Sequence, residues 1–115
     1  MNKRKCIMMK FAVLLCILFS LNSCSSSDNN YSPESRTIEI RQMQFFPAEL
    51  ELHKFDTVIF INHDLVEHNI TEESGKYWTS SALLPGKSWK LAITQSANYF
   101  CSIHPVMKGK LLITR

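Results

Sequence analysis

The sequence contains no apolar run long enough to cross a membrane as a helix. Phe11–Phe19 (FAVLLCILF) is unbroken but has only nine residues. As a helix it would rise about 14 Å, roughly half of a bilayer's hydrocarbon core. Four basic residues and no acidic one occupy the first ten positions. This pattern predicts a secretory signal peptide over residues 1–23, with a permanent anchor helix over Ile7–Leu21 as the alternative.

Cysteine is scarce as well, and its placement excludes an internal disulfide in the mature protein. Cys6 and Cys16 would leave with the signal peptide. Leu21-Asn22-Ser23-Cys24 resembles the bacterial lipobox, which implies that Cys24 becomes an acylated N-terminus anchoring the protein to a membrane. An ordinary secretory signal with an incidental Cys24 is the alternative. Cys101 is then the one free thiol, either buried and inert, reactive, or bound to a metal.

The mature part has no excess of either charge. From Cys24 onward nine Lys and Arg residues stand against ten Asp and Glu residues, a net charge of about −1 with His neutral. The +3 of the whole chain therefore belongs to the signal peptide. This balance gives no indication of nucleic-acid binding.

Helical periodicity is also missing after the signal peptide. Ser25–Glu34 is polar and predicts a flexible tether, so that residues 24–35 form a lipidated N-terminus and linker. Residues 36–115 alternate between apolar and polar positions in short segments separated by turn residues. They predict one all-β domain, a Greek-key sandwich of about seven or eight strands. The clearest strand patterns are Thr37–Arg41, Glu49–Leu52, Thr57–Ile61, Ser88–Ile93, Tyr99–Cys101 and Lys110–Thr114.

The most informative motif is C-x-x-H-x-x-M, formed by Cys101, His104 and Met107 between two predicted strands. A thiolate, an imidazole and a thioether on one tight loop suit copper in both oxidation states. Zinc would more often take several Cys and His residues, and magnesium or calcium would take oxygen ligands. A fourth ligand must come from elsewhere. His68, after a predicted central strand, is the main candidate, and His63 in the preceding turn is the competitor.

These motifs together resemble the cupredoxin family of type 1 blue copper proteins, most closely the amicyanin, plastocyanin and pseudoazurin group. The resemblance covers roughly Thr37–Thr114 and includes an N-x-D loop, a His-Asn pair and the late C-x-x-H-x-x-M. It implies a cupredoxin-like sandwich with one copper ion. Further matching segments are Phe46-Pro47, Asp56-Thr57-Val58, Leu84-Pro85-Gly86 and Met107-Lys108-Gly109-Lys110.

The resemblance also implies a role for each site residue. His68, Cys101 and His104 would form a trigonal plane around the copper, and Met107 would be a weak axial ligand. Asn69 would hydrogen-bond to the Cys101 loop and hold the two ligand segments together. His104 would expose its outer ring edge on an apolar surface through which electrons pass.

The sequence departs from the family pattern at three places. Phe55 replaces the Gly that usually precedes D-T-V, so this turn has no residue for which a positive φ is easy. Ser96-Ala97 replaces a Pro-Gly pair. Ile103 replaces the Pro that commonly precedes the second ligand His, and unlike Pro it has a backbone N–H. We hypothesise that this N–H donates to the Cys101 sulfur and raises the reduction potential.

The function that follows from the resemblance is single-electron transfer between redox partners in the bacterial cell envelope, without catalysis. The expected partners are redox proteins such as a cytochrome or a dehydrogenase, and we expect a monomer. A periplasmic copper-binding or copper-delivery protein is the alternative, although Met43, His53 and His63 are the only further Met and His residues of the mature part. A fragment of an oxidase or nitrite reductase is a further possibility, but it would need H-x-H motifs, and this sequence contains none. A structural zinc domain or adhesion sandwich is the last possibility.

Overall fold

The computed structural model describes residues 30–115. The predicted signal peptide, Cys24 and most of the predicted tether lie outside the described residues. Tyr31–Arg115 form one compact unit. Within residues 30–115, no helix has the length and apolar character needed to cross a membrane. The strands of this unit are β1 (Ser35–Arg41), β2 (Gln44–Phe46), β3 (Glu49–His53), β4 (Thr57–Asn62), β5 (Thr71–Glu72), β6 (Ser88–Ala92), β7 (Ala97–Phe100) and β8 (Lys108–Thr114).

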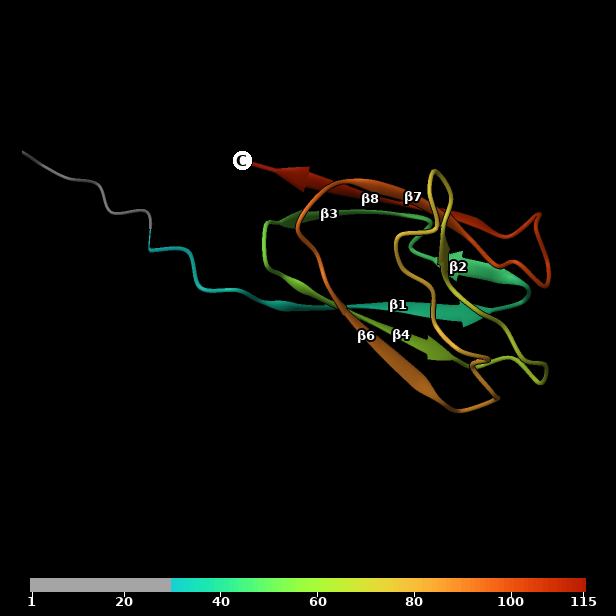
Figure 1. Ribbon diagram of the computed structural model, residues 1–115. Coiled ribbons are helices and arrows are strands. Elements are labelled where there is room, and N and C mark those ends of the chain that lie inside the picture. The colour runs from blue at the N-terminus through green and yellow to red at the C-terminus, as the bar shows by residue number, and fades with distance from the viewer. Residues whose placement is uncertain (1–29) are drawn as a thin grey trace, which may run out of the picture. The chain divides into compact units, whose positions relative to one another are not determined.

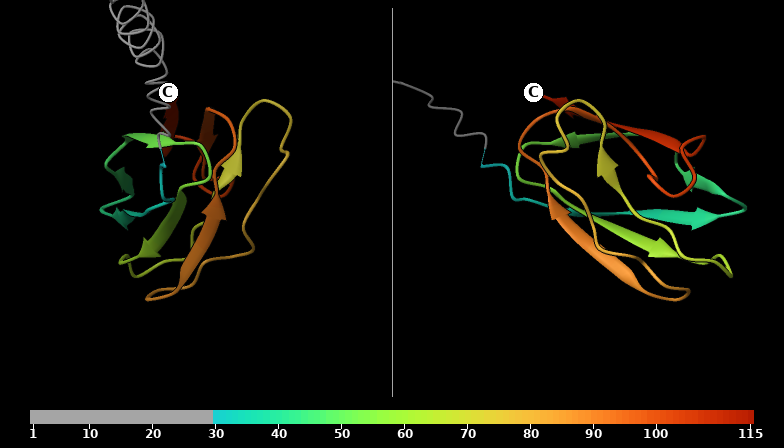
Figure 2. Two further views of the ribbon diagram at one scale, coloured as in Figure 1. Left: turned by 90° about the vertical axis from the view of Figure 1, so that its left-hand side faces the viewer. Right: turned by 45° about the vertical axis from the view of Figure 1, so that its right-hand side comes forward.

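The strands form the two layers of a β-sandwich (Figure 1). One sheet has the order β2-β1-β4-β6 and the other β3-β8-β7-β5. The pairs β1–β4 and β3–β8 are parallel, and the remaining neighbours are antiparallel. Two neighbouring strands can be parallel here because the chain passes from one sheet to the other between them, instead of turning back within one sheet. Figure 2 shows these crossings from two further directions. The predicted all-β sandwich is confirmed.

The core lies between the layers and follows from the alternation in the strands. Ile38 and Ile40 of β1, and Val58 and Phe60 of β4, are fully buried because alternate residues of a strand face the same side. Burial of each such side chain stabilises the fold by about 1.5–3 kcal/mol.

An aromatic cluster occupies the middle of the core. The ring of Tyr99 lies 4.9 Å from that of Phe45 and 5.4 Å from that of Phe60, and both pairs meet edge to face. This is the arrangement that aromatic quadrupoles favour. Trp78, which packs against the core from its margin, lies 6.3 Å from Tyr99.

The ring of Tyr99 also explains the glycine at position 109. A Cβ at Gly109 would lie 2.1 Å from Cζ of Tyr99, so any side chain there would collide with the ring. The Tyr99 hydroxyl is buried and has no hydrogen-bond partner within residues 30–115. Burial raises the pKa of this hydroxyl above its ordinary value. The phenol is thus neutral, and its oxygen is an unsatisfied polar atom in the core.

The sequence patterns indicated the six longer strands but not β2 or β5. β2 follows a two-residue turn in which Gln42 and Met43 have φ values of 53° and 59°. Hairpin turns of this kind usually contain Asn or Gly, which tolerate positive φ. The turn was not recognisable because it lacks these residues. β5 consists of only two residues, Thr71 and Glu72, too few for any alternation to be visible.

The turn at Phe55 uses a positive φ although no glycine is present. Phe55 has a φ of 77°, a region that L-residues with a Cβ enter at a cost of roughly 1–2 kcal/mol. Its N–H donates to the carbonyl of Ile93 at 2.6 Å, and its side chain is largely exposed. The turn therefore has a positive φ at a residue poorly suited to it.

Part of the segment predicted as a tether packs on the domain. Asp56, which is almost fully buried, accepts hydrogen bonds from the Tyr31 hydroxyl and from the N–H groups of Glu34 (2.8 Å) and His53 (2.9 Å). Burial alone would raise the pKa of Asp56, but these hydrogen bonds outweigh it and hold the pKa below its ordinary value. β1 begins at Ser35, within the range predicted as linker.

We predict that Tyr99→Phe stabilises the protein by about 1 kcal/mol, because it removes a buried hydroxyl with no partner and keeps the ring. Denaturant unfolding of the two proteins measures the difference.

Tyr31→Phe is the matched control. It deletes the same atom type, but this hydroxyl donates to Asp56, so the free energy of unfolding should fall. Equal destabilisation by both changes would show that the Tyr99 hydroxyl has a favourable partner.

Candidate metal centre

Three chain segments meet at the right-hand end of the sandwich in Figure 1. They are the β1–β2 turn, the connection from β4 to β5, and the loop from β7 to β8. The connection between β5 and β6 also reaches this end, because Leu83 pairs with His68 through two backbone hydrogen bonds. These segments carry all of the predicted ligands.

The structure brings together three of the four predicted ligand side chains. Nδ1 of His68 and Nδ1 of His104 each lie 3.9 Å from Sγ of Cys101, and 3.2 Å from each other. His68 and Cys101 are fully buried, whereas His104 is partly exposed. The competing His63 lies outside this group. Its ring is half exposed and its Nε2 is 3.9 Å from a carboxylate oxygen of Glu39.

The three donor atoms fit a single metal ion. A circle through them has a radius of about 2.1 Å, close to the bond lengths of about 2.0–2.3 Å that nitrogen and sulfur ligands form with a first-row ion. A point within bonding distance of all three atoms therefore exists in their plane. Two imidazoles and one thiolate in a trigonal plane are the donor set of blue copper sites.

Met107 lies at the closing point of the ligand loop. Its N–H donates to the carbonyl of His104 at 2.9 Å, and its own carbonyl accepts from the N–H of Cys101 at 3.1 Å. Its side chain is 2% exposed. These contacts fold the Cys101–Met107 segment into a compact loop with the methionine inside the domain.

Asn69 joins the two ligand segments. Its Oδ1 accepts from the N–H of Ser102 at 2.8 Å, and its Nδ2 donates to Oγ of the same serine at 2.6 Å. Its backbone N–H donates to Sγ of Cys101 at 3.4 Å. A residue next to His68 is therefore bonded to the loop that bears Cys101 and His104.

The structure does not support the contact hypothesised for Ile103. Within the described part of the chain, its N–H makes no hydrogen bond to Cys101 Sγ, and the N–H that reaches the sulfur is that of Asn69. The backbone N–H that approaches the sulfur thus comes from the segment after His68. Ile103 instead exposes its side chain beside His104.

Asp64 contacts the ring of His68 on the side away from the metal position. The distance from Oδ2 of Asp64 to Nε2 of His68 is 2.8 Å. Burial would raise the pKa of Asp64, but hydrogen bonds from the Met43 N–H, from His68 and from the Gln42 N–H hold it below the ordinary value. The carboxyl group is therefore ionised. From the sequence alone, Asp64 is identified only as part of the N-x-D loop motif.

Exposed apolar side chains surround this end of the domain. They lie in the same segments that supply the ligands, so that the partly exposed ring of His104 has apolar neighbours along the chain. Their exposed fractions range from 43% to 94%: Leu65, Val66, Leu84, Ile103 and Val106.

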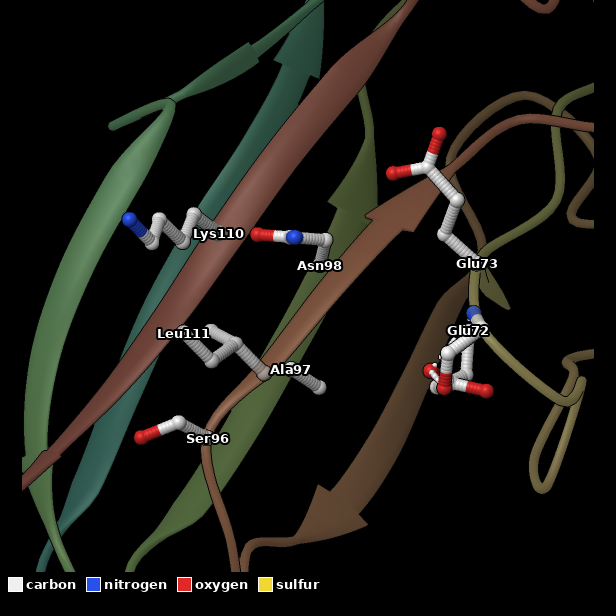
Figure 3. A pocket seen from close by; sticks show the side chains of 8 residues that line it. Glu72, Glu73, Ser96, Ala97, Asn98, Lys110 and Leu111 are labelled. Atoms are coloured by element: carbon white, nitrogen blue, oxygen red, sulfur yellow. Dashed lines mark hydrogen bonds between the residues drawn. The ribbon is translucent and has the colours of Figure 1, made fainter.

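A separate hollow of about 510 Å³ lies over β5, β7 and β8 and contains none of the predicted ligands (Figure 3). The carboxylate of Glu72 at its edge accepts from the Ser74 hydroxyl and from backbone N–H groups of residues 74, 75 and 77. These bonds lower the pKa of Glu72 to about 2, chiefly through the hydroxyl of Ser74. The carboxylate of Glu72 therefore stabilises the loop that follows it.

Comparison with known proteins is consistent with this geometry. No family model matches the chain. Amicyanin from Paracoccus denitrificans is 29% identical over 84 residues, which are 66% of this chain and 63% of that protein. Amicyanin from Paracoccus versutus is 22% identical over 82 residues, 66% of this chain and 62% of that protein. The chain therefore covers less than two thirds of the curated relatives it matches.

Solved structures show the same fold. A variant of amicyanin in its Cu(I) form has a TM-score of 0.65 at 23% identity, covering 70% of this chain and 82% of that one. The copper-containing nitrite reductase of Thermus scotoductus SA-01 has a TM-score of 0.66 at 24% identity. That match covers 74% of this chain but only 23% of the reductase.

A two-layer β-sandwich of this topology, with two imidazoles and a thiolate converging at one end, defines a class of small metal-binding domains. The chain has the fold of this class, the cupredoxins, and its donor residues converge in the same way. The curated relatives that it matches are amicyanins, in agreement with the pattern of the Cys101–Met107 loop.

We predict that Ile103→Pro leaves the reduction potential of the copper-loaded protein equal to that of Ile103→Ala, because neither change removes a hydrogen bond to the sulfur. Voltammetry of the two variants measures this. A lower potential in the proline variant alone would show that the Ile103 N–H does act on Cys101.

Proposed function

We propose that this protein binds one copper ion through His68, Cys101, His104 and Met107 and carries single electrons. The observation that supports this most strongly is the trigonal convergence of three donor atoms on a point about 2.1 Å from each. Similarity to amicyanins supports the choice of copper. When bound, the copper supplies a one-electron couple between Cu(II) and Cu(I).

The residues of the chain keep the donor atoms in place during this exchange. His68 is held by its backbone pairing with Leu83 and by Asp64, and Cys101 by the N–H of Asn69. Because the sheets and these hydrogen bonds fix the ligands, a change in metal charge requires little movement. Small reorganisation favours fast electron transfer.

We propose His104 as the point of electron exchange. It is the only one of the three converging side chains that is partly exposed, and its surroundings are apolar. A neutral apolar surface allows brief contact with a redox protein without a strong charge requirement. We propose a redox protein such as a cytochrome or a dehydrogenase as the partner, and a monomeric carrier.

We propose no catalytic role for the domain. The hollow over β5, β7 and β8 lacks the predicted ligands, and the nitrite reductase matches over only a quarter or so of its own length. No observation favours the copper-delivery alternative. Two of the three donors are fully buried, whereas a delivery protein would need an open site.

Addition of Cu(II) to the metal-free protein should produce an intense visible thiolate-to-copper absorption band. Cys101→Ser should abolish this band and His68→Ala should abolish or shift it, since both supply donors.

His63→Ala is the control for this experiment, because it removes an imidazole from the same loop without touching the donor group. A colourless protein, or a band that survives Cys101→Ser, would contradict the proposed site.

From the sequence we further propose that the protein is attached to a bacterial membrane by lipid on Cys24, with the domain on the periplasmic or outer side. The lipobox-like residues before Cys24 support this. Cys24→Ser should move the protein from the membrane fraction to the soluble fraction of the envelope. Fractionation unchanged by this substitution would contradict the lipid anchor.

A further inference from the structure

The carboxylate of Asp64 accepts three hydrogen bonds from two different segments. Oδ1 accepts the N–H of Gln42 at 2.6 Å. Oδ2 accepts the N–H of Met43 at 3.0 Å and lies 2.8 Å from Nε2 of His68. The side chain is only 14% exposed, so water competes little for these positions.

The bond to Asp64 determines which nitrogen of His68 carries a hydrogen. Both carboxylate oxygens of Asp64 already accept backbone N–H groups, so Nε2 of His68 is the donor in its contact with Oδ2. In a ring with a single N–H, Nδ1 then has a free lone pair. This is the atom that lies 3.9 Å from Cys101 Sγ and 3.2 Å from Nδ1 of His104. The tautomer favoured by Asp64 is thus the one that can bind a metal at the centre of the three donors.

Asp64 is itself held in place by the loop around it. Its N–H donates to Oδ1 of Asn62 at 2.9 Å. Nδ2 of the buried Asn62 donates to the carbonyls of Val66 and Leu83, both at 2.8 Å. Since Leu83 pairs with His68, the loop, the carboxylate and the ligand are connected through one network.

The β1–β2 turn completes this arrangement. Gln42 and Met43 both have positive φ, which is unfavourable for residues with a Cβ, and both direct their N–H groups to Asp64. The carboxylate therefore stabilises the turn, and the turn in return limits the positions that the carboxylate can take.

We propose that Asp64 is a positioning residue that fixes the tautomer and the ring direction of His68 before any metal binds. This inference rests on the proposed copper site for its functional meaning, but the tautomer itself is a property of the metal-free protein. With copper bound, the negative charge beside Nε2 makes His68 a stronger donor and favours the higher metal charge. Loss of that charge raises the reduction potential.

The first experiment uses the metal-free protein and needs no copper. Long-range ¹H–¹⁵N correlation spectra of the histidine rings should show His68 with its hydrogen on Nε2. In Asp64→Asn, which cannot accept all three hydrogen bonds, His68 should become a mixture of tautomers. The control Glu67→Gln removes one negative charge from the neighbouring exposed residue and should leave the tautomer unchanged. An unchanged tautomer in Asp64→Asn would overturn the proposal, whatever the protein does with copper.

The second experiment measures copper binding and potential. Removal of a partner that orients a metal-bound His typically lowers metal affinity about 10–100-fold. We expect a loss in this range for Asp64→Asn, together with a higher reduction potential, and neither effect of comparable size for Glu67→Gln. Equal effects of the two substitutions would show that only net charge matters and would overturn the positioning role.

A third variant separates the turn from the ligand. In the double substitution Gln42→Asn and Met43→Gly, the turn has residues that tolerate positive φ without support from Asp64. In this background Asp64→Asn should cost less folding stability than it does in the original chain, but it should still change the His68 tautomer and lower the copper affinity. If Asp64→Asn changed none of these three properties in this background, Asp64 would serve only the turn, and the proposal would be overturned.

Discussion

The hydrogen bonds between Asn69 and the Cys101 loop are the interaction on which the rest of the site depends. His68 and Cys101 are 33 residues apart and lie on connections that leave different strands. Without a metal, two histidine rings and a cysteine sulfur have no strong attraction that would keep them within 4 Å of one another. The Asn69 side chain, paired with Ser102, keeps the two segments in register, and its backbone N–H stabilises the sulfur. The sandwich supplies the rigid ends to which these segments are attached.

This arrangement explains why the metal-binding end can be both organised and exposed. The sheets bury Tyr99, Phe60 and their neighbours in one core, so the loops above them need little packing of their own. Polar contacts hold much of the loops instead, and five of their apolar side chains are left on the surface: Leu65, Val66, Leu84, Ile103 and Val106. Under the proposed function, such a site would change little when the metal changes charge, and the partly exposed ring of His104 would be accessible to a partner.

The sequence predicted most of the fold because its strands alternate clearly. Apolar and polar residues alternate in the stretches of β1, β3 and β6, and the nearly continuous apolar run of β4 indicates a central strand, whereas no pattern indicates β2 or β5. β2 depends on a turn of Gln42 and Met43, whose positive φ values no local pattern reveals, because the carboxylate that supports them is 21–22 residues away in sequence. The Cys101–Met107 loop was visible because its spacing is local. The choice of His68 over His63 required the resemblance to relatives, and the role of Asp64 required the folded structure. The contact of the Asn69 N–H with the sulfur joins distant segments, so the sequence alone did not indicate it.

The central claim is that the three donor atoms are in position before the metal arrives. Crystal structures of the metal-free and Cu(II)-loaded protein, compared at high resolution, test it most directly. The account predicts that Nδ1 of His68, Nδ1 of His104 and Sγ of Cys101 occupy the same positions to within about 0.5 Å in both forms. Side chains that point apart in the metal-free crystal and converge only around copper would contradict it.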